Sequence, residues 1–480
     1  MKKTIVFLFP VLLLACQQKP AGNAPEPVAQ TTPAAATTFQ PANAAEQAIY
    51  SRAFNAVIWG MPAVNFELMH ENLIKVKGNL NQMIYWSKPV NAKNQTLTPN
   101  PDVIYFNPFY DTRKGPVVLE IPPAAGVSSI TGSIDDCWQT AIEDVGPAGV
   151  DKGKGGKYLI LPPGYKEKAP AGYIPMPSST YTGFVILRSN LTDGSEADVA
   201  RAVAYGQTVK IYPYGGSSTA AMDFIDVDFG NVITYNIHFF EALDQFVQRE
   251  PWITRDMAMI DQLKTIGIEK GKTFKPDSRT QTILEAAIND ARHYLDGVYL
   301  KAFADPFYEN THWALPVDPS FIKAIDENYS DPNIYPVDSR GVGYSIAYFS
   351  AKHIGTGQFY LMSIMDDAKQ PFSGAKTYRL HLPAGVPVKL YWSVTAYDRE
   401  THALIKGVNR ASRSSVSPGL QKNADGSVDV YFGPKAPAGK ESNWVPTDAQ
   451  RGFELLARFY GPEKGFFEKT WKMGNVEEVK

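Results

Sequence analysis

The sequence predicts an α+β protein, mainly β, with two β-sandwich or jelly-roll-like domains, a helical N-terminal pair and a helical middle section. Short runs rich in β-branched and aromatic residues, separated by glycine and proline, occur at residues 98–188 and again beyond residue 331. Apolar residues recur at helical intervals at residues 45–76 and 195–303. Of the 480 residues, 37 are glycine and 36 are proline, and this composition favours many turns.

Residues 1–15 have the pattern of an export signal. Two lysines precede an apolar run, Ile5–Leu14, which is too short to span a bilayer as a mature helix. The run ends in Leu-Leu-Ala before Cys16, and this sequence resembles the bacterial lipobox, in which the cysteine is lipidated after cleavage. Because Gln17 follows, not aspartate, we expect an anchor on the periplasmic face of an outer membrane. The alternative is a secreted protein with an unmodified cysteine.

Residues 16–44 are expected to form the lipidated cysteine and a disordered tether. The segment is rich in proline, alanine and threonine, and its only charged residues are Lys19 and Glu26. Such a composition buries too little apolar surface to fold. A tether of this length would hold the folded part roughly 30 Å from the membrane.

Residues 45–215 are expected to hold the helical pair and the first β domain. Helical spacing runs through residues 45–57 and 62–76, and Pro62 is expected to separate two helices. Ser195 is a candidate helix cap near the end of this region. The predicted strands lie at residues 102–109, 117–121, 158–161 and 184–188.

Residues 216–330 are the expected helical middle section, and residues 331–480 are the expected second β domain. The strongest helical pattern runs through residues 282–303, where apolar residues recur at helical intervals. In the second β domain, apolar and other residues alternate from Val386 to Val394, which predicts a strand.

Charge and cysteine content exclude some classes of function. Lys and Arg total 47 and Asp and Glu total 49, so the sequence has no basic footprint for nucleic acid. With Cys16 lipidated, Cys137 has no cysteine partner and is expected to be a buried small side chain. The closest two of the seven histidines, His293 and His312, are 19 residues apart, which fits no short-spaced zinc motif. We therefore expect no metal ion and no other cofactor.

Several motifs resemble two bacterial families, domain of unknown function 1254 and domain of unknown function 1214, which commonly occur in that order in one chain. The motifs of the first lie at residues 59–62, 98–102, 115–119 and 187–188. The motifs of the second lie at residues 390–398, 425–427, 443–446 and 457–460. The resemblance implies β-sandwich or jelly-roll-like domains with helical additions, and an oligomer, but no particular reaction.

Polar and aromatic residues in or beside these motifs are the candidate ligand-binding residues. Asn100 and Asp102 flank a proline before a predicted strand, where their side chains could instead satisfy loop backbone groups. His402 follows the motif that ends at Asp398. The full candidate set is Asn100, Asp102, Arg188, Tyr391, Asp398, His402, Asn443 and Arg458.

The two arginines of this set lie on predicted strands. Arg188 shares a strand face with Phe184 and Ile186, so either the strand emerges into solvent there or a carboxylate holds the guanidinium near the interior. The candidate carboxylates are Asp102 and Asp135, and in that case replacing Arg188 with methionine should cost ~3–5 kcal/mol. Arg458 lies opposite the apolar face of its strand and projects either into an interdomain cleft or into water.

Two functions of different classes fit these observations. The first is a membrane-tethered binding or scaffold protein that holds a saccharide or another small component of the cell envelope. The second is a periplasmic hydrolase whose site is assembled between the two β domains, with His402, Asp398 and Arg458. Expected partners are the lipid bilayer through Cys16, a small ligand and a second copy of the chain, but not nucleic acid.

Overall fold

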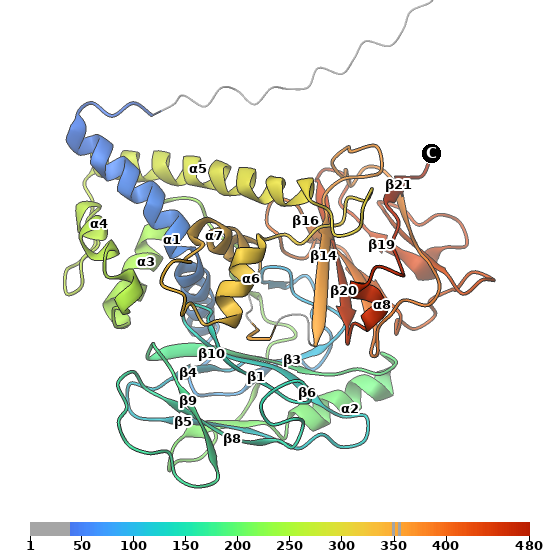
Figure 1. The fold of residues 1–480 in the computed structure, drawn as a ribbon, viewed down its shortest axis with the longest axis horizontal. Helices are drawn as coiled ribbons and strands as arrows, with labels where there is room; N and C mark the ends of the chain where they lie inside the picture. The colour runs from blue at the N-terminus through green and yellow to red at the C-terminus, as the bar shows by residue number, and fades with distance from the viewer. Residues whose placement is uncertain (1–38, 348–350, 354–356) are drawn as a thin grey trace, which may run out of the picture. The chain divides into compact units, whose positions relative to one another are not determined.

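The computed structural model describes residues 39–347, 351–353 and 357–480 (Figure 1). The expected export signal, Cys16 and nearly all of the expected tether lie outside these residues. The chain divides into one unit that ends at Gln40 and a compact unit that begins at Pro41. The compact unit has the expected mixed α+β architecture. None of the helices within the described ranges has an apolar run long enough to cross a bilayer.

The compact unit begins with one long helix, α1 (Ala44–Lys75), where the sequence predicted two. The helix continues through Pro62, although proline supplies no N–H for the carbonyl four residues earlier, that of Ile58. Gly341 packs against this carbonyl so closely that a Cβ atom there would lie 3.0 Å from the oxygen. The helix is buried on every side around Pro62, so tertiary packing offsets the lost hydrogen bond.

Asn43 caps α1, because its Oδ1 atom accepts hydrogen bonds from the backbone N–H groups of Ala45 and Glu46. A chain that begins at Ala45 should therefore be about 1 kcal/mol less stable than one that begins at Pro41. Urea unfolding of the two chains measures the difference. In the longer chain, Asn43→Ala should reproduce the loss, and equal midpoints for all three proteins would contradict a stabilising cap.

The first β region consists of two sheets that pack face to face. One has the strand order β12-β1-β3-β10-β6-β7, with β4 also paired to β10, and the other has the order β11-β5-β8-β9. Val185 and Leu187 of the first sheet and Leu119 and Ile160 of the second belong to one core. The bounds are β1 (Ile84–Tyr85), β3 (Ile104–Phe106), β4 (Phe109–Asp111), β5 (Val117–Ile121), β6 (Ile130–Asp136), β7 (Ala141–Val145), β8 (Gly156–Leu161), β9 (Tyr173–Pro177), β10 (Thr182–Ser189), β11 (Lys210–Pro213) and β12 (Met222–Asp223).

Helix α2 (Glu196–Gly206) lies between β10 and β11 in the chain and begins as predicted. The Ser195 side chain accepts a hydrogen bond from the backbone N–H of Asp198. A separate pair of short strands, β2 (Asn94–Gln95) and β13 (Phe229–Gly230), joins two distant loops.

The second β region also has two facing sheets. Their strand orders are β14-β20-β16-β17 and β19-β18-β15-β21, and they share one apolar core. The alternating segment that begins at Val386 was wrongly predicted to be a strand, because β16 begins only at Trp392 and Leu390 is exposed. The bounds are β14 (Gln358–Ser363), β15 (Tyr378–Leu382), β16 (Trp392–Asp398), β17 (Ser412–Ser414), β18 (Val428–Gly433), β19 (Trp444–Pro446), β20 (Phe453–Tyr460) and β21 (Val476–Glu478); the short helix α8 (Lys464–Phe467) follows β20.

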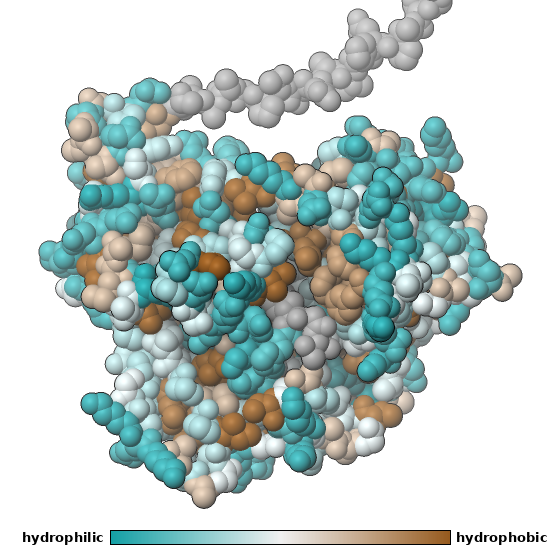
Figure 2. All heavy atoms as spheres, in the orientation of Figure 1, coloured by the Kyte–Doolittle hydropathy of each residue, from teal (hydrophilic) through white to brown (hydrophobic). Residues whose placement is uncertain are grey.

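The remaining helices pack around α1, and together they contact the faces of β10 and β20 that point away from the two-sheet cores (Figure 1). They include the expected long helix α5 (Ser278–Lys301). The others are α3 (Ile237–Arg249), α4 (Met259–Thr265), α6 (Pro319–Asp326) and α7 (Val337–Ile346). On the face that Figure 2 shows, hydrophilic side chains predominate and apolar ones form small groups.

The packing of the helices and sheets buries two strands, β10 and β20, completely. Strands β10 and β20 are central in their sheets, and every residue of both is buried. One face of each strand lies in its own two-sheet core, and the other faces the helices and the opposite β region. Polar residues on these inner strands are therefore removed from water.

Candidate functional site

Arg188 of β10 and Arg458 of β20 line the same small cavity between the two β regions. Only 5% of Arg188 and 2% of Arg458 is exposed. Each lies on the face of its strand that points away from its two-sheet core, as the apolar neighbours of that face show. The cavity has a volume of about 30 Å³. Two permanently charged guanidinium groups thus share one buried space.

Arg458 is held by uncharged partners. It donates hydrogen bonds to the Thr395 hydroxyl at 3.0 Å, the Thr98 carbonyl at 2.8 Å and the Tyr397 hydroxyl at 2.7 Å. Its guanidinium carbon also lies 5.4 Å from the centre of the Tyr360 ring. These contacts fix the side chain without neutralising its charge.

Arg188 has fewer partners. Its guanidinium carbon lies 5.6 Å from the centre of the Tyr105 ring, and its Nε atom has no hydrogen-bond partner within the described part of the chain. Of the two alternatives that the sequence left open, emergence into solvent or a position near the interior, the structure shows the second. The predicted ion pair with a carboxylate was wrong, because no described Asp or Glu lies within ion-pair distance of Arg188. The charge of Arg188 acts on Asp135 only at longer range, and its nearest titratable neighbours are tyrosines, Tyr105 first.

Neither of the two candidate carboxylates, Asp102 and Asp135, forms an ion pair with Arg188. Asp102 accepts a hydrogen bond from the Ser412 hydroxyl at 2.7 Å. Burial raises the pKa of Asp102, although the Ser412 hydroxyl and the Arg458 charge act in the opposite direction. Neither carboxylate oxygen of Asp135 has a hydrogen-bond partner among the described residues. Burial, with the nearby charges of Asp144 and Asp136, raises the pKa of Asp135 well above its ordinary value, while the charge of Arg188 acts in the opposite direction.

Asn100 connects the loop before β3 to the second β region. Its Nδ2 atom donates hydrogen bonds to the hydroxyls of Tyr391 at 3.1 Å and Tyr460 at 2.9 Å, whose rings stack 4.4 Å apart. Its Oδ1 atom accepts from the backbone N–H of Asp102 at 2.9 Å, so the loop role weighed for Asn100 is also present. Five candidates, Asn100, Asp102, Arg188, Tyr391 and Arg458, therefore lie in or beside the same junction.

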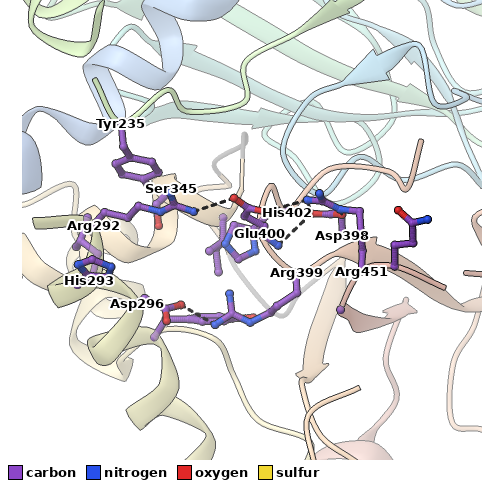
Figure 3. Close-up of a pocket in the computed structure, with 15 residues that line it drawn as sticks. Tyr235, Arg292, His293, Asp296, Ser345, Asp398, Arg399, Glu400, His402 and Arg451 are labelled. Atoms are coloured by element: carbon purple, nitrogen blue, oxygen red, sulfur yellow. Dashed lines mark hydrogen bonds and ion pairs between the residues drawn. The ribbon is translucent and has the colours of Figure 1, made fainter. Parts of the chain in front are cut away.

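Asp398 and His402 lie in a separate, larger pocket of about 630 Å³ between α5 and the second β region (Figure 3). The His402 Nδ1 atom is 2.7 Å from Glu454, which is fully buried and accepts a hydrogen bond from the Tyr299 hydroxyl at 2.9 Å. Arg458 does not line this pocket, so the predicted trio of His402, Asp398 and Arg458 does not assemble.

Ion pairs neutralise most charges of this larger pocket. Arg399 pairs with Asp296 at 2.6 Å, Arg292 pairs with Glu400 at 3.4 Å, and Arg451 pairs with Asp398 (Figure 3). Burial acts to raise the pKa of Asp398, but the hydrogen bonds from Arg451 and backbone N–H groups keep it below its ordinary value.

Asn443 lies in neither cavity. Its Oδ1 atom accepts a hydrogen bond from the backbone N–H of Gln421, and its Nδ2 atom donates to the carbonyls of Gln421 and Asp429. These bonds fix a loop. Glu454 and Tyr360 were not among the candidate residues predicted from the sequence. Glu454 could have been found from its position on the strand face of Arg458, but no pattern marks Tyr360. The described residues hold no group of three or more His, Cys, Asp or Glu side chains placed to bind a metal ion.

Comparison with known proteins identifies two family segments. Residues 80–213 match a family described as a protein of unknown function (DUF1254), and residues 357–464 match another described as a protein of unknown function (DUF1214). No curated protein matches the chain.

Two solved structures resemble the fold. The VPA0106 protein from Vibrio parahaemolyticus is 16% identical, with a TM-score of 0.58 over 90% of this chain and 100% of that one. An uncharacterised protein from Burkholderia cenocepacia is 10% identical, with a TM-score of 0.41 over 91% of this chain and 94% of that one. The first likeness shows that the whole architecture occurs in another bacterial protein.

Proposed function

We propose that this chain, which joins the DUF1254 and DUF1214 families in that order, is a binding protein for a small anion. The anion would lie between Arg188 and Arg458, where the two β regions meet. The observation that carries the proposal is the buried charge of Arg188, which is 95% buried, forms no ion pair with a described carboxylate and has an Nε atom without a hydrogen-bond partner.

An anion would correct an electrostatic imbalance in this cavity. A buried charge without a counter-ion is costly, and the cost falls when an opposite charge pairs with it at close range. Guanidinium groups bind carboxylates and phosphates through two parallel hydrogen bonds. An uncharged saccharide would leave Arg188 without a counter-ion, so the geometry favours an acid among the envelope ligands considered from the sequence.

Small anions provide the test. Thermal unfolding of the full chain should shift upward with acetate at constant ionic strength, because a ligand that binds only the native state stabilises it. Arg188→Met should weaken the apparent affinity at least tenfold. The matched control is Arg379→Met, which removes a half-exposed arginine paired with Glu477. An equal shift in the wild type and both variants would contradict binding at Arg188.

The envelope location is part of the proposal. Cys16 follows a sequence that resembles the lipobox, and its lipid chains would anchor the protein firmly to a membrane. We expect Cys16→Ser to move the protein from the membrane fraction to the soluble fraction of a bacterial host, and to abolish labelling with a radioactive fatty acid. A wild-type protein that takes up no label would contradict lipidation.

One observation favours hydrolysis as a second candidate function. His402 is oriented by buried Glu454 through Nδ1, and its ring lines the 630 Å³ pocket, as a general base that activates water requires. His402→Gln should then remove hydrolysis of small chromogenic esters. Activity that is absent from the wild type, or unchanged in the variant, would exclude this role.

A further inference from the structure

We infer that the anion bound between Arg188 and Arg458 is a carboxylate whose apolar group, about the size of one aromatic ring, fills an adjoining cavity. This inference rests on the proposed anion binding and names the class of ligand that the same site takes. It depends on the sizes and linings of two neighbouring cavities. The polar cavity is the one that Arg188 and Arg458 line, and the apolar cavity is its neighbour, lined mainly by apolar side chains.

The polar cavity is small. Its volume of about 30 Å³ exceeds the ~10–15 Å³ that one water molecule needs, but leaves room only for a small group. A planar carboxylate with two oxygens is smaller than a tetrahedral phosphate, and it matches the fork of a guanidinium group. Arg188, Arg458 and the aromatic rings of Trp86 and Tyr105 bound this space. The size of the polar cavity therefore favours a carboxylate over a phosphate.

The apolar cavity lies beside it and is larger. Its volume is about 130 Å³, and its wall is formed mainly by aliphatic and aromatic side chains, among them Val317, Phe321, Ile325 and Met362. An engineered cavity of roughly 150 Å³ with a comparable lining stays free of water and binds benzene. The apolar cavity has room for a group of about that size.

The two cavities share part of their walls. Thr98, Tyr360 and Leu456 line both of them. Leu456 and Arg458 are alternate residues on the same face of β20, so their side chains leave the strand about 7 Å apart. A short linker of two carbons between a carboxylate and a ring spans such a distance. One ligand can therefore place its charge beside Arg458 and its ring beyond Leu456.

Three probes separate the parts of this inference. Acetate carries the charge alone, 3-phenylpropanol carries the ring alone, and 3-phenylpropionate carries both. Calorimetric titration of the full chain should show that 3-phenylpropionate binds at least tenfold more tightly than either other probe. It should also bind more tightly than phenyl phosphate.

Two kinds of variant assign the binding to the two cavities. Arg188→Met should remove the preference for 3-phenylpropionate over 3-phenylpropanol. Val317→Phe or the half-buried Ile322→Phe should fill the apolar cavity, weaken 3-phenylpropionate at least tenfold and leave acetate binding unchanged. The control is Val127→Phe, which adds the same ring at an exposed position.

The outcomes distinguish this inference from the proposed function. If acetate binds through Arg188 but 3-phenylpropionate binds no more tightly, the inference fails and anion binding stands. A preference for phosphate would also overturn the inference alone. If none of the anions binds, the proposed function fails. If 3-phenylpropanol binds as tightly as 3-phenylpropionate, the apolar cavity acts without the arginines and the inference is overturned.

Discussion

Arg249→Met is expected to destabilise the protein by about 3–5 kcal/mol, because it leaves two buried carboxylates without their counter-ion. Arg249 ends α3 and contacts both oxygens of Glu67 on α1, one of them at 3.0 Å. Its Nε atom also lies 3.1 Å from Glu250. Glu67 is 0% exposed and Glu250 is 2% exposed. Urea unfolding measures the loss.

The same arginine connects the helices to the first β region. Glu250 accepts hydrogen bonds from the backbone N–H of Tyr181 at 2.7 Å and from the Thr182 hydroxyl at 2.5 Å. Arg379→Met is the control, since the half-exposed pair of Arg379 with Glu477 should contribute no more than about 1 kcal/mol. Similar losses of unfolding free energy for the two variants would show that the buried cluster of Arg249, Glu67 and Glu250 stabilises the protein no more than an exposed ion pair.

The loss should depend on pH. Burial acts to raise the pKa of Glu67, but the hydrogen bonds from His70 and Arg249 and their charges lower it below the ordinary value. A lowered pKa means that Glu67 stabilises the native protein above the pKa of the unfolded chain, about 4.3, and that this stability is lost as the pH falls. Without Arg249, Glu67 would take up a proton more readily. The difference between variant and wild type should therefore shrink from pH 7 to pH 4.

Arg188→Met should have the opposite effect on the protein without ligand. The loss of ~3–5 kcal/mol that a carboxylate partner would imply is not expected, since the structure shows no such partner. The variant removes an unpaired buried donor, which costs about 1–3 kcal/mol, and loses a cation–π contact of about 0.5–2 kcal/mol. We expect the free energy of unfolding to stay unchanged or to rise by up to about 2 kcal/mol.

Acetate should reverse this order. Near saturation it should stabilise the wild type and leave Arg188→Met unaffected, so that the wild type becomes the more stable protein. Unfolding curves with and without acetate at constant ionic strength measure both effects. A loss of several kcal/mol in the variant without ligand would mean that Arg188 stabilises the native fold by itself, and the proposed site would lose its main support.

Local structure could be predicted from the sequence where one face of an element is apolar. The α2 cap at Ser195 and the strand that contains Arg188 follow from such local patterns. The pattern was misleading where tertiary contacts decide the outcome. Pro62 did not end α1, because close packing against Gly341 covers the carbonyl it leaves unpaired. The alternation after Val386 did not form a strand, because Pro387 supplies no N–H for a sheet.

The site was predictable in part. Periodicity placed Arg188 on the apolar face of its strand and Arg458 opposite the apolar face of its own, and left open whether either side chain reaches solvent. The structure puts both in one cavity. The uncharged surroundings of Arg188 could not be predicted, because its neighbours come from strands far apart in the sequence. The separation of Asp398 and His402 from Arg458 has the same origin. Spacing along one chain does not reveal which faces of two sheets meet.

The complete burial of β10 and β20 also has a kinetic consequence. Because the two arginines of the cavity are 95% and 98% buried, we expect its contents to exchange with bulk water only through a transient local opening. Association should then be slower than the 10⁵–10⁷ M⁻¹s⁻¹ typical of preformed exposed sites. The observed rate should level off at high ligand concentration, where opening becomes the slow step. A modest affinity can then coexist with a long residence time of the bound molecule.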